Sequence, residues 1–175
     1  EGANWTAAEL LKAYRAVAWN GEGWAPSGVD LLAQWQGGLT WIETSKLADS
    51  SGIRGVTWPF TDLHFSLFHT QKKLATHEHL RLAKEFSVDS LTRIVLRARQ
   101  AFENGDPLSF ANAIGEYGIN LSEQGLVASH TLEILGSLRA QSIQGVLSAK
   151  GCGALGADVI LVLHRPQAFE PLRRW

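Results

Sequence analysis

Apolar residues recur at helical spacing in the first third of the chain. Residues 6–19 place their apolar side chains on one stripe, and Thr6 can cap the first turn of the resulting helix. A loop rich in Gly and Pro is expected at 20–26, and a short helix at 27–36 that Gly37 and Gly38 end. Leu39–Ile42 is a predicted strand. The stripe of the first helix consists of Leu10, Leu11, Tyr14, Val17 and Ala18.

The rest of the chain mixes short apolar runs with longer helical periods. His64–His69 has the aromatic and aliphatic density of a strand, and a second strand is predicted at 145–150. The continuous apolar run at 159–163 predicts a central strand covered by helices. Helices are predicted at 73–86, at 88–102 with an end at Asn104 and Gly105, from Pro107 onward with Leu108, Ala111 and Ile114 buried, and at 131–139.

This order of elements lacks a regular β-α-β alternation. It therefore predicts an α+β fold, a two-layer sandwich in which a mostly antiparallel sheet carries helices on one face. A polar stretch at 45–52 interrupts the pattern. We place the predicted domain boundary at its start, which gives an N-terminal part of residues 1–45 and a C-terminal domain of residues 46–175.

Composition narrows the class of protein. Hydrophobic residues make up 45% and charged residues 19% of the chain, which is typical of a globular protein. The formal net charge is −1 and no basic block is present, so neither nucleic acid nor a membrane is an expected partner. The single cysteine, Cys152, excludes an internal disulfide and favours a cytoplasmic location. We interpret Cys152 as a small buried residue. The sequence contains no methionine, which indicates a processed chain, a fragment or replaced residues.

The first candidate for chemistry is Asp30, in the segment Pro-Ser-Gly-Val-Asp at 26–30. A carboxylate in the first turn of a helix can accept a proton from a substrate hydroxyl or orient that hydroxyl. The alternative is structural, because Ser27 and Asp30 have the spacing of a capping box, and this is the commoner reason for such a pattern. Trp24 lies beside the same loop and could form a wall of the substrate site.

A glycine-rich turn at 151–156, preceded by Lys150, is the second candidate. Glycine allows the backbone to approach a ligand closely, and successive N–H groups in such a turn can bind anions. A tight turn between two strands is the commoner explanation. The strand end at 68–73 supplies Thr70, Lys72 and Lys73, which could contact phosphate oxygens or remain solvated surface residues.

No metal site is predicted. His77 and His79 are two residues apart, so on a helix they would point to different sides, whereas metalloprotease ligands are four apart.

Taken in chain order, these segments resemble the GHMP kinases, the superfamily of galactokinase, homoserine kinase, mevalonate kinase and phosphomevalonate kinase. The specific parts are Ser-Gly-Val-Asp at 27–30 with Gly37-Gly38-Leu39, then Phe-His-Thr-Gln-Lys-Lys at 68–73, and Lys-Gly-Cys-Gly-Ala-Leu-Gly-Ala at 150–157. The likeness covers most of the chain and is to the C-terminal portion of such an enzyme.

The resemblance implies ATP- and Mg²⁺-dependent phosphoryl transfer to a small alcohol or phosphorylated acceptor. It places Asp30 opposite the acceptor hydroxyl, with an acceptor site drawn from Ser27, Gly28, Trp24, Thr70, Lys72 and Lys73. It also assigns the support of the nucleotide phosphates to Lys150, Gly151, Gly153, Ala154 and Gly156.

Two features depart from the family pattern. The phosphate-gripping segment Pro-x-x-x-Gly-x-Gly-Ser-Ser has no match here, and Leu155 stands where the last glycine-rich motif usually has glycine. The phosphate grip would then come from a missing N-terminal segment or a second chain. Two other functions remain open, namely a non-catalytic ligand-binding or regulatory module that keeps the fold, and an assembly subunit that pairs with a complementary chain.

Overall fold

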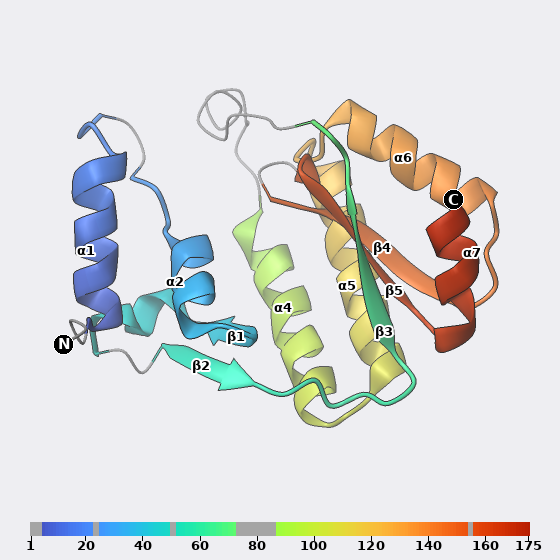
Figure 1. The fold of residues 1–175 in the computed structure, drawn as a ribbon, viewed down its shortest axis with the longest axis horizontal. Helices are drawn as coiled ribbons and strands as arrows, with labels where there is room; N and C mark the ends of the chain where they lie inside the picture. Colours follow the sequence, from blue (N-terminus) through green and yellow to red (C-terminus); the bar gives the residue numbers. More distant parts are fainter. Residues whose placement is uncertain (1–4, 23–24, 50–51, 73–86, 154–155) are drawn as a thin grey trace. The chain divides into compact units, whose positions relative to one another are not determined.

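The computed structural model describes residues 5–22, 25–49, 52–72, 87–153 and 156–175 (Figure 1). The chain divides into two compact units, Glu1–Trp58 and Pro59–Trp175. The sequence had suggested a domain boundary between residues 45 and 46. The first unit extends further because strand β2 (Ile53–Val56) pairs with strand β1 (Leu39–Ile42) across the polar stretch between them.

The first unit packs two helices and a short 3₁₀ helix, η1 (Thr44–Asp49), with a two-stranded antiparallel sheet. Helix α1 (Ala7–Ala18), helix α2 (Val29–Gln36) and strand β1 lie where the sequence predicts them, whereas strand β2 was not anticipated. The core of this unit is formed by side chains from all of these segments. Its buried members are Ala7, Leu11, Leu32 and Leu47, with Leu10, Tyr14, Ile42 and Ile53 packed around them.

Helix α1 begins with the predicted cap. The Thr6 backbone N–H donates to the Glu9 carboxylate at 2.8 Å, and the Glu9 N–H donates to the Thr6 hydroxyl at 3.2 Å. The bond from the Thr6 backbone lowers the pKa of Glu9 below its usual range. The predicted stripe is correct at Leu11 and wrong at Val17, which is 90% exposed because the helix turns that position away from the core.

The second unit is built on the antiparallel sheet β3-β5-β4, formed by β3 (His64–His69), β5 (Val159–His164) and β4 (Val146–Cys152). Strand β5 pairs along its whole length with β3, from His64 opposite His164 to His69 opposite Val159. It pairs with β4 on its other side. The predicted central position of the apolar run at 159–163 is therefore confirmed.

Helices contact both sides of this sheet. Residues of α6 (Ser129–Ala140) and the C-terminal helix α7 (Phe169–Arg174) pack on the face that carries Ile160 and Val162. Helix α5 (Pro107–Glu123) lies against the opposite face of β4, where Gly115 adjoins Ser148. The α+β class and the antiparallel sheet are confirmed, but the expectation that all helices lie on one face does not hold in detail.

Helix α4 (Val88–Glu103) and helix α5 form a pair whose shared core is Ile94, Ala98 and Ala113. Asp106 accepts hydrogen bonds from the backbone N–H groups of Leu108 and Ser109, so it caps α5 at the predicted Pro107 start. Leu108 was expected to be buried, but it is 51% exposed. The predicted helix at 73–86 lies outside the described residues. None of the described helices combines the length and apolarity needed to cross a bilayer.

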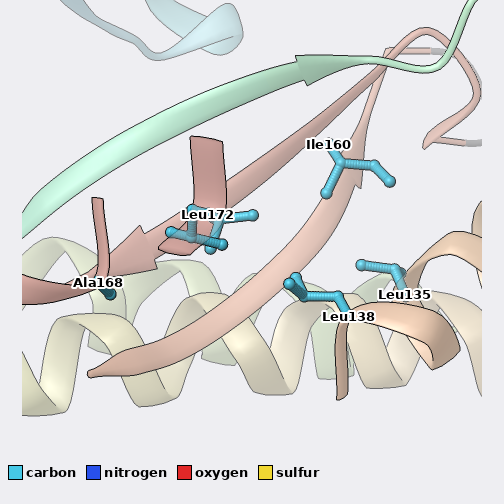
Figure 2. Packing of buried hydrophobic residues seen from close by; sticks show 6 residues of the cluster. Leu135, Leu138, Ile160, Ala168 and Leu172 are labelled. Atoms are coloured by element: carbon cyan, nitrogen blue, oxygen red, sulfur yellow. The ribbon is translucent and has the colours of Figure 1, made fainter. Parts of the chain in front are cut away.

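The main core lies between β5, α6 and the C-terminal segment (Figure 2). Ile160 and Val162 of β5 have no exposed surface, and Leu172 of α7 is almost completely buried. Trp175, at the end of the chain, packs edge-on against Phe68 of β3, with ring centroids 5.5 Å apart. Helix α7 was not predicted from the sequence, although its contacts close this core.

A buried polar pair also joins β3 to β5. The Ser66 hydroxyl lies 2.9 Å from Nε2 of His164, whose Nδ1 lies 2.8 Å from the carbonyl oxygen of Arg165. Since a carbonyl oxygen can only accept, Nδ1 donates to Arg165, and Nε2 pairs with the Ser66 hydroxyl. The fully buried imidazole of His164 thus has both nitrogens satisfied.

The position of Leu172 makes the role of α7 testable. We expect Leu172→Ala to lower the free energy of unfolding by about 2–5 kcal/mol, because it leaves a cavity beneath β5. Leu96→Ala is the matched control, since Leu96 is 57% exposed on α4, and it should change stability by less than about 0.5 kcal/mol. Urea denaturation of both variants is the measurement, and equal effects would show that α7 does not close the core.

Candidate functional site

Helix α2 starts differently from the capping box that the sequence suggested. Its N-cap is Gly28, which has a left-handed backbone with φ of 70°, and no side chain caps the helix. A Cβ at Gly28 would lie 2.3 Å from Cδ1 of Leu11, so a side chain here would displace Leu11, and the left-handed backbone also favours glycine. The capping interpretation of Ser27 and Asp30 is therefore wrong, because the helix begins one residue later than that pattern requires.

Asp30 is consequently an exposed acid in the first turn of α2. No hydrogen bond or ion pair holds its carboxylate within the part of the chain that the structure describes. The loop before it is held by Arg15, whose Nε donates to the carbonyl oxygen of Pro26 at 3.1 Å. This side chain had no role in the sequence interpretation. Ser27 is exposed beside Asp30, and Trp24 lies outside the described residues.

The glycine loop, residues 151–156, brings two glycines into close backbone contact. A Cβ on Gly151 would lie 2.6 Å from both Cα and the carbonyl oxygen of Gly156. Gly153 and Gly156 have left-handed backbones, with φ of 80° and 64°. The two ends of the turn therefore touch backbone to backbone, which side chains would prevent. Ala154 and Leu155 lie outside the described residues.

Two residues from other segments, Thr70 and Thr131, form hydrogen bonds with the end of this loop and with the residues that follow it. The Thr70 N–H donates to the Asp158 carbonyl oxygen at 3.0 Å, and the Thr70 hydroxyl is within hydrogen-bonding distance of the Ala157 and Asp158 carbonyls. Thr131 of α6 donates its hydroxyl to the Gly156 carbonyl oxygen at 3.0 Å. Thr70, predicted as an acceptor contact, thus has a positioning role next to the glycine loop.

Lys150 leads into the glycine loop and is partly buried. Its Nζ donates to the Gly151 carbonyl oxygen at 2.8 Å and lies 3.5 Å from Sγ of Cys152. The same ammonium group is 5.6 Å from the centre of the Tyr117 ring on α5, and burial raises the pKa of the Tyr117 hydroxyl. Cys152 is partly exposed rather than buried.

Asp158 is a candidate to which the sequence interpretation gave no role. Its Oδ1 is buried and has no hydrogen-bond partner among the described residues. A Cβ on Gly153 would lie 3.1 Å from its Oδ2, so the carboxylate packs directly against the glycine loop. A buried carboxylate oxygen without a partner is costly unless a cation or ligand group satisfies it. The available signal was an acid immediately following a glycine-rich run.

The structure brings Thr70, Lys150, Gly151, Gly153 and Gly156 together in the second unit. Asp30, Ser27 and Gly28 belong to the first unit and form a separate group. Lys72 is exposed two residues after Thr70, and Lys73 lies outside the described residues, as do His77 and His79. Within the described ranges, no three His, Cys, Asp or Glu side chains gather as a metal site.

Comparison with solved structures agrees with this architecture. No protein-family model matches the chain, and no curated protein sequence matches it. The crystal structure of L. major mevalonate kinase in complex with R-mevalonate matches 98% of this chain and 54% of its own, with a TM-score of 0.60 and 15% identity. A mevalonate diphosphate decarboxylase from Legionella pneumophila matches 70% of this chain and 44% of its own, with a TM-score of 0.43 and 13% identity.

This chain thus spans about half the length of the mevalonate kinase that it matches. At this level of identity the likeness concerns the fold. The chain has the α+β fold of about half of that mevalonate kinase, as the resemblance found in the sequence implied.

Proposed function

We propose that the chain forms part of an ATP-dependent kinase that phosphorylates a small alcohol or an already phosphorylated small acceptor. The observation that carries this proposal is the glycine loop, where Gly151 and Gly156 meet backbone to backbone next to Lys150. A turn of this kind, with left-handed residues at Gly153 and Gly156, can direct backbone N–H groups at an anion. The fold shared with mevalonate kinase supplies the context.

The loop and its surroundings fit nucleotide phosphates and a cation. The contact between the buried Gly151 and Gly156 closes the turn, and the exposed Gly153 offers backbone that phosphate oxygens can approach. Asp158 offers a buried carboxylate oxygen that has no partner among the described residues, which suits Mg²⁺, an ion that needs only one or two carboxylates beside substrate phosphates and water. Bound ATP and Mg²⁺ would supply the transferable phosphoryl group and neutralise its charge.

Asp30 is the proposed acid–base residue. Its carboxylate is exposed, lies in the first turn of α2 and is not used as a cap, so it is available to accept the proton of an acceptor hydroxyl. The anchored loop of Arg15 and Pro26 fixes the start of that helix. Trp24, Ser27, Gly28, Lys72 and Lys73 complete the proposed acceptor side, and R-mevalonate, bound by the similar kinase, is the first acceptor to test.

The sequence lacks the phosphate-gripping segment of the family, so the proposal requires a second source of phosphate contacts. We propose that residues outside this sequence or another chain provide them, in a cytoplasmic enzyme. The same missing segment favours one alternative, a non-catalytic ligand-binding or regulatory module that uses the fold alone. An assembly subunit that pairs with a complementary chain is the other alternative carried over from the sequence.

Nucleotide affinity is the first test. We expect the 175-residue chain to bind ATP–Mg²⁺ weakly, because the glycine loop provides only part of the phosphate contacts. In isothermal titration calorimetry, the dissociation constant should lie well above the low-micromolar range. Asp158→Asn should weaken any Mg²⁺-dependent part of this binding, while Asp89→Asn on α4 should not. A low-micromolar dissociation constant for the unmodified chain would show that the phosphate grip is complete without further residues.

Substitution of Asp30 tests catalysis. In the protein that carries this chain, we expect Asp30→Asn to reduce transfer of phosphate from ATP to the acceptor by a factor of about 10²–10⁴, the usual contribution of acid–base catalysis. Asp89→Asn is the matched control, because Asp89 also lies in a first helical turn without a side-chain cap bond.

Both substitutions should change the thermal midpoint to a similar, small extent, since each removes one favourable charge near a helix N-terminus. Normal turnover by the Asp30→Asn protein would show that Asp30 is not the acid–base residue. Absence of ATP-dependent transfer to any small alcohol in the unmodified protein would favour the regulatory alternative.

A further inference from the structure

A cavity of about 320 Å³ lies along the edge strand β4, between helices α5 and α6. We call it the α5–α6 cavity. Its walls include Ile119 of α5, Leu138 and Arg139 of α6, and the β4 residues Val146 to Ala149. All of these residues belong to the second unit, and none lies in the glycine loop.

Two features of the packing create this space. Helix α5 approaches β4 through glycines, since a Cβ on Gly115 would be 3.1 Å from Cβ of Ser148. Helix α6 instead packs its buried residues Leu135 and Leu138 with Ile160 of the central strand β5. The outer edge of β4 is therefore left between the two helices, and Ile119 on the wall is 50% exposed.

The walls of the cavity are mostly apolar and include a few polar groups. Apolar side chains from α5, α6 and β4 provide most of the lining, which is typical of a small-molecule site, and the volume falls in the lower range for such sites. Ser148 contributes a buried hydroxyl oxygen without a hydrogen-bond partner among the described residues. A buried hydroxyl of this kind can be satisfied by a water molecule or by a polar group of a bound ligand.

Among the described residues that line this cavity, Arg139 is the only charged one. No ion pair of its guanidinium group occurs in the described part of the chain. A smaller hollow of about 120 Å³ continues past Arg139 and includes Glu123 at its α5 side. The main cavity therefore combines an apolar interior, the hydroxyls of Ser142 and Ser148, and one positive charge at the exposed rim.

We propose that the α5–α6 cavity binds a small amphipathic anion, an aliphatic molecule with a single anionic head group. The aliphatic part would lie against Ile119, Leu138 and Leu147, and the head group would pair with Arg139. The Ser148 hydroxyl would gain a hydrogen-bond partner on the same molecule. This site is independent of the proposed kinase reaction, because none of its residues belongs to the acceptor or nucleotide groups described above.

Octanoate is the probe, and amide chemical shifts of the full 175-residue chain are the readout. We expect saturable shifts at Val146 to Ala149 and at Ile119. Arg139→Gln should weaken octanoate binding about threefold to tenfold, as for an ion pair at a partly exposed site, and should leave binding of uncharged 1-octanol unchanged. Arg93→Gln on α4 is the matched control and should have no effect on either probe.

Ile119→Trp provides a second variant that fills the cavity from an exposed wall position, and it should abolish binding of both probes without lowering the thermal midpoint. Octanoate shifts that avoid β4, or an equal loss of affinity in the Arg93→Gln protein, would overturn the proposal. It would also be overturned if a short apolar peptide shifted the β4 amides while octanoate did not, because the occupant would then be an added strand.

Discussion

The pairing of β5 with strands on both of its sides is the constraint on which the second unit depends. The strand satisfies its backbone groups through β3 and β4, and its fully buried side chains Ile160 and Val162 lie on the face that also carries His164. That face then requires cover, which α6 and the C-terminal helix α7 supply. The polar interior of the same strand is limited to His164, whose two ring nitrogens are both satisfied.

The glycine loop takes its shape from the same pairing. It joins β4 to β5, and the last register pair before it is Cys152 opposite Val159. Closure at this point leaves so little room that Gly151 and Gly156 touch. The hydroxyls of Thr70 and Thr131 donate hydrogen bonds to backbone carbonyl oxygens at the end of this turn. A conformation held by a sheet and two threonines suits a loop that must present backbone groups without rearranging.

The proposed chemistry is divided between the two units. Asp30 is supported by α1 through Arg15 and by the close contact of Gly28 with Leu11, whereas the proposed phosphate contacts belong to the sheet of the second unit. Phosphoryl transfer depends on positioning and on neutralising charge, so the proposed activity needs both sets together with phosphate contacts that the sequence lacks.

The sequence alone determined the type and order of most elements, because hydrophobic periodicity and capping are local properties. It located α1 with its Thr6 cap, the strands β1 and β3, the central strand β5, and α5 starting at Pro107.

Only the tertiary structure decided which apolar residues are buried, as Val17 and Leu108 show, since burial depends on which neighbours a helix meets. The same applies to Gly28, Asp158 and α7. Gly28, with a left-handed backbone next to Leu11, takes the cap position in place of Ser27. The Asp158 carboxylate packs against Gly153, and its buried Oδ1 has no partner among the described residues. Helix α7 is stabilised by a core that residues distant in the sequence form.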